Sequence, residues 1–177
     1  MFNSASLAVV QKGLKNLQVI EITLLLAVSI VIQFFIHLIP PVEGLPLGQI
    51  LLPAFYAPLF ALMFFRMHVA LTTAILTPMI NYLITGFPRP EILPLLTIEL
   101  VIFVVIAYFI LQNKNVQLIS AMTAVVFAKI VSAVIMPLIF TGYAGGLLFQ
   151  SLIVAVPGIL ILSVLNILLL RYKNSNG

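Results

Sequence analysis

The stretch Val116–Phe140, VQLISAMTAVVFAKIVSAVIMPLIF, contains one charged residue, Lys129, in an otherwise apolar or small polar run. The run is long enough for a helix to cross the hydrocarbon core of a bilayer. A charge near the middle of such a span costs about 2.5–3.5 kcal/mol on insertion scales, so it normally pairs with another group or lines a wet cavity. We expect Lys129 to have a partner, and Glu99 in the preceding apolar run is the candidate.

The whole chain has the same apolar character as this stretch. It has 177 residues, of which 63% are hydrophobic and 7% are charged. Because soluble domains carry about 25% charged residues, this composition predicts an integral membrane protein without a soluble catalytic module. The net charge is +4, but the basic residues fall in tails and loops, which indicates membrane topology rather than nucleic-acid binding. The chain has no cysteine, which excludes disulfides and thiolate metal sites.

Six apolar runs predict an all-α integral membrane protein, a six-transmembrane-helix bundle formed by a single domain over residues 1–177. The expected spans are about 20–39, 48–65, 69–84, 93–111, 116–140 and 147–170. The first run has no cleavage site after it, so we expect it to be retained as a span. The second and third runs are short and contain Pro53, Pro58 and Pro78. Kinked or broken helices are therefore expected there.

The distribution of basic residues predicts the orientation. One side of the six-span arrangement collects most of them: Lys12, Lys15, Arg66, Lys114, Arg171 and Lys173. The other side carries only Arg89, accompanied by Glu43 and Glu91. By the positive-inside rule, both termini are predicted to be cytoplasmic.

The polar residues inside the predicted bundle concentrate in its outer half. At 1.5 Å per helical residue, Glu99 lies about 9 Å and Lys129 about 16 Å below the outer edge, which the lysine side chain can bridge. Further candidates in that half are Asn81, Gln150, Arg89 and Tyr143. Together these residues predict a pocket that opens outward and holds a small ligand. Alternatively, Glu99 and Lys129 form a purely structural pair, and Asn81 and Gln150 make only interhelical hydrogen bonds.

Motifs of catalysis are missing from the sequence. It has no HExxH, no GxSxG, no paired aspartates and no glycine-rich phosphate loop. His37 and His68 fall on opposite sides of the predicted bundle, so they cannot share a metal ion. We therefore expect a chain that is not an enzyme, has no cofactor or metal site, and does not hydrolyse ATP itself.

Three segments are similar, in their order and spacing, to motifs of a known family. Gly86–Leu100, GFPRPEILPLLTIEL, is similar to a G-x-P…LPLMTxEL segment, and Ala128–Ala133, AKIVSA, to a G-[RK]-I-V-x-A segment. Phe149–Ile159 contains a …Q…PGI pattern typical of the closing span. With these motifs the chain resembles the substrate-binding S components of energy-coupling factor (ECF) vitamin transporters, most closely the pantothenate-type branch.

The resemblance implies a multi-pass protein of the prokaryotic plasma membrane that captures a small water-soluble vitamin or precursor, such as pantothenate. It also implies ATP-driven uptake together with a transmembrane coupling subunit and two cytoplasmic ATPase subunits. Two alternatives remain open. One is an autonomous secondary carrier with Glu99 as the proton-coupling site, and the other is a membrane assembly or partner protein without a ligand.

Overall fold

The computed structural model of the chain describes residues 4–42, 44–139 and 148–176. In these residues it contains helices and turns but no β-strand. Within the described residues, five helices are long and apolar enough to cross a membrane, which indicates a multi-pass membrane protein. The elements are α1 Ser4–His37, α2 Leu47–Leu51, the 3₁₀ helix η1 Pro53–Phe55, α3 Tyr56–Phe64, α4 Met67–Thr85, α5 Leu93–Leu111, the 3₁₀ helix η2 Gln117–Ile119, α6 Ser120–Ile139 and α7 Leu148–Asn176.

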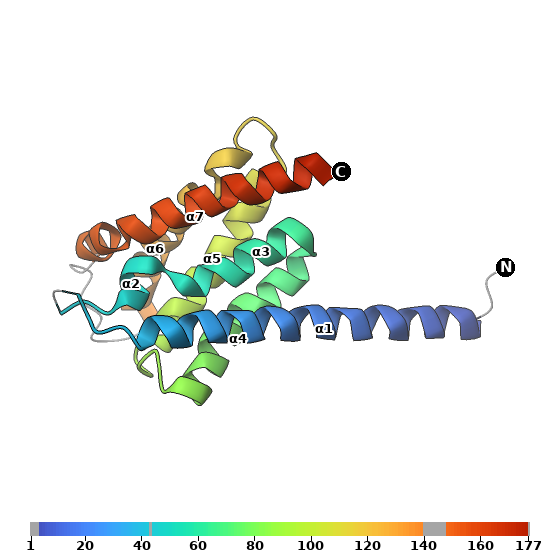
Figure 1. Cartoon of the computed structure of the whole chain (residues 1–177), viewed down its shortest axis with the longest axis horizontal. Helices are drawn as coiled ribbons and strands as arrows, with labels where there is room; N and C mark the ends of the chain where they lie inside the picture. The colour runs from blue at the N-terminus through green and yellow to red at the C-terminus, as the bar shows by residue number, and fades with distance from the viewer. Residues whose placement is uncertain (1–3, 43, 140–147, 177) are drawn as a thin grey trace.

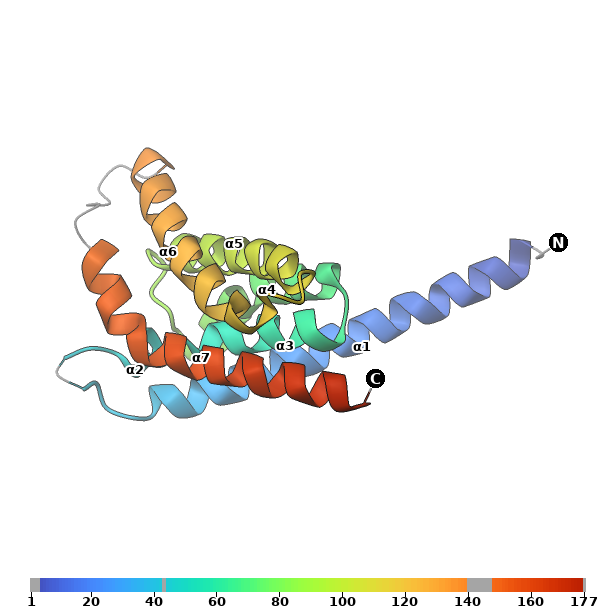
Figure 2. The same cartoon turned by 90° about the horizontal axis from the view of Figure 1, so that it is seen from above.

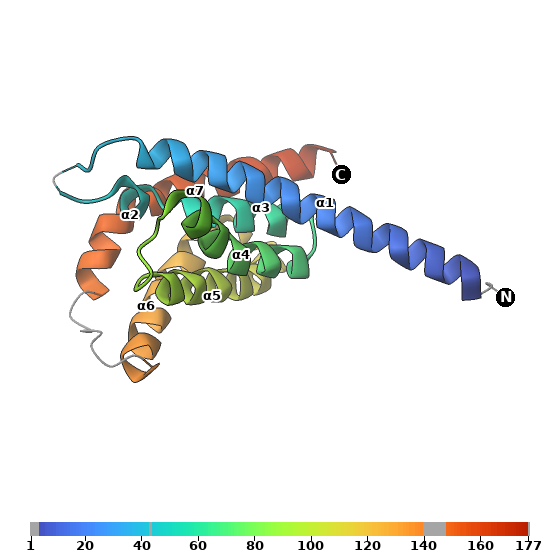
Figure 3. The same ribbon diagram turned by 90° about the horizontal axis from the view of Figure 1, so that it is seen from below.

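Helices α1, α3 and α7 lie roughly along the long axis of the molecule, whereas α4 and α5 run obliquely to it (Figure 1). Helix α1 runs toward one end of the bundle, and α3 and α7 run back, so that the start of α1 and the end of α7 lie toward the same end. The first part of α1 projects beyond the other helices (Figures 2 and 3). Loops 38–46 and 86–92 meet at the opposite end, where the rings of His37 and Phe87 stack with centroids 4.9 Å apart.

The expected second span, 48–65, is interrupted. Leu52 has the left-handed backbone conformation (φ 54°, ψ 44°), and Pro53 begins the 3₁₀ turn that follows. The interruption leaves the carbonyl of Leu51 without a helical donor, and the hydroxyl of Tyr56 donates to it at 2.6 Å. The backbone group freed by the break is thus satisfied inside the protein, as an apolar environment requires.

The other expected spans correspond to long helices. Helix α5 has the expected bounds, 93–111. Helix α1 begins at Ser4, well before residue 20, and ends at His37, while α7 begins at Leu148 and continues past residue 170 to Asn176. Helix α4 is continuous through Pro78, so no break of the third span is found. The structure therefore has five long apolar helices and one divided segment where six spans are expected.

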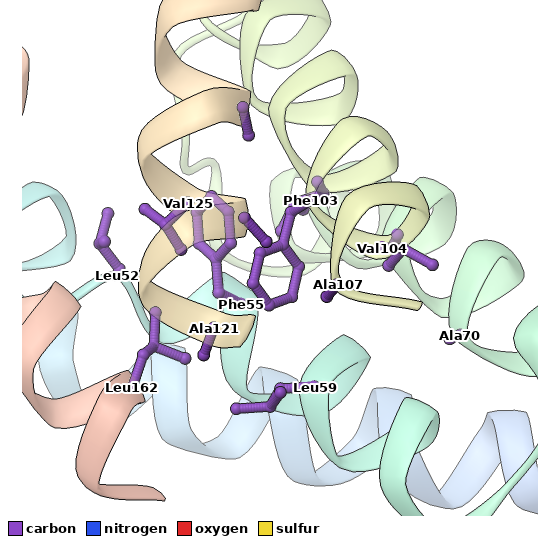
Figure 4. Packing of buried hydrophobic residues seen from close by; sticks show 14 of the residues in the cluster. Leu52, Phe55, Leu59, Ala70, Phe103, Val104, Ala107, Ala121, Val125 and Leu162 are labelled. Atoms are coloured by element: carbon purple, nitrogen blue, oxygen red, sulfur yellow. The ribbon is translucent and has the colours of Figure 1, made fainter. Parts of the chain in front are cut away.

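The core of the bundle combines two aromatic rings with many small side chains. Phe55 of η1 and Phe103 of α5 meet edge to face, with centroids 5.1 Å apart and planes at 84° (Figure 4). Around them the helices present buried alanines, among them Ala107 of α5 and Ala121 of α6. Small residues let helices approach closely, which is the usual means of packing where lipid removes the hydrophobic drive between helices.

Helix α7 packs directly on the backbone of α2. A Cβ atom built at Gly158 would lie 2.6 Å from the carbonyl oxygen of Ile50 and 2.7 Å from the carbonyl carbon of Leu51. Real Cβ atoms essentially never approach that closely. The glycine of the Pro157–Gly158 pair therefore lets α7 hold the interrupted segment in place.

Candidate functional site

A cavity of about 720 Å³ lies at the end of the bundle where loops 38–46 and 86–92 meet. Its volume falls in the range of small-molecule sites, and most of its lining is apolar, as such sites usually are. The polar side chains that line it are Gln33, His37, Gln49, Asn81, Arg89, Glu99, Lys129, Ser132, Gln150 and Ser151. They come from α1, the interrupted second segment, α4, α5, α6, α7 and the loop between α4 and α5.

A direct ion pair is the charged centre of this lining. Lys129 Nζ of α6 donates to Glu99 Oε2 of α5 at 3.4 Å, and the two residues are only 8% and 7% exposed. The hydroxyl of Ser132, one helical turn after Lys129, lies 3.1 Å from the other carboxylate oxygen, Oε1, and 3.0 Å from the main-chain carbonyl oxygen of Lys129, and it can donate to either. Both oxygens of Glu99 thus have a donor within reach, and the charges of the pair sum to zero.

A second polar group links α1 and α4 across the cavity lining. Asn81 Nδ2 donates to Gln33 Oε1 at 2.9 Å, and Gln33 Nε2 donates to Ser29 Oγ at 2.9 Å. The hydroxyl of Thr85 donates to the Asn81 carbonyl at 2.7 Å. Asn81 therefore does make an interhelical hydrogen bond, while it also lines the cavity. One hydrogen of its amide is left for a further acceptor.

The rim of the cavity combines aromatic, cationic and amide groups. His37, at the end of α1, stacks on Phe87, and the exposed Arg89 lies two residues further along the same loop. Gln150 contributes an exposed amide from the first turns of α7. Groups of this kind can fix the orientation of a ligand whose body lies against the apolar walls.

The structure brings five of the six predicted site residues to this one cavity: Glu99, Lys129, Asn81, Gln150 and Arg89. Tyr143 lies outside the described residues. Their role in binding stays a prediction, whereas their convergence is a finding of the structure.

From the sequence, Gln33 falls in the outer half of the first span but is not among the predicted site residues, and Gln49, Ser132 and Ser151 are not singled out. Helical spacing is the signal that could identify two of them. Gln33 lies four residues before His37, and Ser132 lies three after Lys129, so each shares a helix face with another polar residue. Gln49 belongs to the short helix α2, which ends at the break at Leu52. A helix of five residues is too short to show such a spacing of polar residues.

Within the described parts of the chain, no group of three or more His, Cys, Asp or Glu side chains is placed to hold a metal ion. No known protein family, curated protein or solved structure matches the chain. What the fold and the cavity define together is an all-helical, multi-pass membrane protein with a ligand-sized cavity at one end of its bundle.

Proposed function

We propose that this chain is the substrate-capture subunit of an ECF-type importer and binds a small water-soluble vitamin or precursor in the 720 Å³ cavity. The observation that carries the proposal is the convergence of Glu99, Lys129 and Asn81 with Arg89 and Gln150 on one cavity, from segments far apart in the sequence. Each of the three stretches that resemble the S components, within 86–100, 128–133 and 149–159, contributes residues to its lining.

The proposal includes six membrane crossings with both termini cytoplasmic. The divided segment Leu47–Phe64 would supply the crossing between α1 and α4. As a straight helix its 18 residues would rise about 27 Å, close to the hydrocarbon thickness of a bilayer. With the basic ends of the helices inside, loops 38–46 and 86–92 and the cavity between them face outward.

The charges of the lining bear on the chemistry of the ligand. Lys129 is already neutralised by Glu99, so the deep part of the cavity suits uncharged hydroxyl or amide groups rather than a second carboxylate. Lys129 retains two ammonium hydrogens and Asn81 one amide hydrogen as donors to such groups. An acidic group of the ligand would instead lie near Arg89 at the rim, so we place a pantothenate-like acid with its carboxylate at the rim.

Uptake through this route requires partners, because the chain has no phosphate-binding loop of its own. We propose a transmembrane coupling subunit and two cytoplasmic ATPase subunits in the plasma membrane of a prokaryote. Capture of the ligand itself needs only this chain.

The test is a thermal-unfolding screen of the detergent-purified full chain with water-soluble vitamins and precursors. A ligand at one hundred times its Kd raises the apparent stability by about 2.7 kcal/mol. Ala133→Phe fills the cavity from α6, whereas Ala27→Phe makes the same change on the exposed face of α1. We expect one compound to stabilise the wild type and Ala27→Phe but not Ala133→Phe.

Two results would count against this function. Equal stabilisation of Ala133→Phe would place the binding site elsewhere, and the absence of any stabilising compound would remove the support for ligand capture. Uptake by proteoliposomes that contain the chain alone distinguishes this function from the main alternative. An autonomous carrier would take up the compound without ATPase subunits, with a pH dependence set by Glu99.

A further inference from the structure

A second, smaller cavity of about 240 Å³ lies at the end of the bundle opposite the first. It is formed where α3, α5 and α7 end and η2 begins. Its apolar walls include Leu62 and Leu170, and its polar side chains include Lys114, Lys173 and Asn174. The volume is below the range of about 300–1,000 Å³ typical of sites for whole small-molecule ligands, so its occupant is a smaller chemical group.

Two lysines give this small cavity a positive charge that no described carboxylate balances. Lys114 precedes η2 and Lys173 lies in the last turns of α7, and both are exposed. Neither makes an ion pair or hydrogen bond within residues 4–42, 44–139 and 148–176. Glu99 and Glu91 belong to the other end of the bundle, and Glu21 lies on α1, which contributes no residue to this lining, so the small cavity suits an anion.

The surroundings of the small cavity place it at the level of the membrane surface. Leu111 of its lining is the last residue of the apolar helix α5. Beside Lys173, the exposed ring of Tyr172 meets the ring of Phe64 edge to face, with centroids 5.9 Å apart. Tyrosine is typical of the layer where the hydrocarbon meets the headgroups. The anion that is most abundant in this layer is a phospholipid phosphate.

We propose that the small cavity binds the headgroup of an anionic phospholipid. Lys114 and Lys173 hold the phosphate from two different elements, Asn174 bonds to headgroup hydroxyls, and the leucines contact the first acyl carbons. Basic pockets between the ends of membrane helices suit such headgroups, because charge attraction and apolar contact act together. A bound lipid would join the ends of α3, α5 and α7. This inference is independent of what occupies the larger cavity.

The test is native mass spectrometry of the detergent-purified full chain during titration with phosphatidylglycerol, phosphatidylcholine or soluble glycerol 3-phosphate. The variant is Lys114→Gln with Lys173→Gln. The matched control is Arg66→Gln with Arg171→Gln, which removes the same charge from exposed residues at that end, outside the cavity. We expect wild type and control to bind one phosphatidylglycerol in preference to phosphatidylcholine, and the lysine variant to bind it roughly thirtyfold more weakly.

A third variant, Lys114→Arg with Lys173→Arg, checks that charge at these two positions is what matters, and we expect it to retain the bound lipid. An equal loss in the arginine-to-glutamine control would show general attraction to the basic end and overturn the site. No preference over phosphatidylcholine in the wild type would also overturn it. If glycerol 3-phosphate binds as tightly as the lipid, the ligand is a soluble phosphate. If the Lys-to-Arg variant loses the preference for phosphatidylglycerol, charge at these positions is insufficient. Either result refutes the proposal as stated.

Discussion

Single and double substitutions of the buried pair Glu99–Lys129 should show how much of its effect on stability comes from the attraction between the two charges. In Lys129→Met the carboxylate of Glu99 stays in place with Ser132 as its remaining donor. In Glu99→Gln the ammonium of Lys129 loses its partner at 3.4 Å. The double variant Glu99→Gln with Lys129→Met leaves no charge at all.

The magnitude follows from the geometry of the pair. At 3.4 Å and an effective dielectric constant of about 20, the attraction between the two charges is about 5 kcal/mol. Much of it offsets the cost of burying both groups, so the net value of the pair is small, but removal of one partner leaves an uncompensated charge and costs about 3–5 kcal/mol. We therefore expect each single variant to lose about 3 kcal/mol of stability. The double variant should lose little, far less than the sum of the two single effects, because it leaves no charge without a partner.

The assay is unfolding of the detergent-solubilised chain by denaturing detergent, with helix content followed by circular dichroism. Ser132→Ala serves as the control for hydrogen bonding alone, and we expect it to lose about 1 kcal/mol. If the two single effects add to within about 0.5 kcal/mol in the double variant, the charges do not interact, and the reasoning about the pair is refuted.

Three further variants test packing and hydrogen bonds elsewhere in the bundle, each by the same unfolding assay. Gly158→Ala should lose about 1–3 kcal/mol because its Cβ meets the α2 backbone, whereas Gly13→Ala, with nothing within 4 Å, should be neutral or stabilising; equal effects would contradict the close contact. Asn166→Ala should lose about 2–3 kcal/mol, because its amide donates to two carbonyls of the η2 region and its oxygen accepts from a serine hydroxyl; a change below 0.5 kcal/mol would argue against these bonds. Tyr56→Phe should lose about 1 kcal/mol, because the carbonyl of Leu51 then has no donor, and an unchanged midpoint would show that it finds another.

The sequence predicts the long helices well, because each is a long apolar run between loops rich in proline or polar residues. Helix α5 has the bounds that its apolar run predicts, and Pro94 lies in its first turn, where proline is tolerated. The extra length of α1 is not predictable from hydropathy. The residues before the apolar run are helical, but they are not part of the apolar stretch that hydropathy detects.

The break in the second span is predictable in kind but not in position. Pro53 indicates that a helix cannot run through unchanged, but nothing marks Leu52 as the residue with a positive φ, which is uncommon outside glycine. Tertiary packing decides it, since Gly158 brings α7 against the backbone just before the break.

In the candidate site, too, the contact between charged residues is predictable from the sequence, whereas the contact between neutral polar residues depends on packing. Glu99 and Lys129 can be paired from the sequence because isolated charges in a membrane are too costly to stay alone. The amide pair of Gln33 and Asn81 cannot, because neutral polar residues are tolerated in many arrangements and only the crossing of α1 and α4 brings these two together.

The interrupted second segment has a consequence for how such a protein could diversify. One wall of the large cavity consists of the closely packed helices α5 and α6, while the facing wall, from Gly44 to Phe55, is a loop, a short helix and a 3₁₀ turn. Mutations at lining positions such as Pro46 or Gln49 reshape the cavity without interrupting any long helix. If the cavity binds a ligand as proposed, selection can therefore change which molecule is recognised at these positions while the long helices stay unchanged.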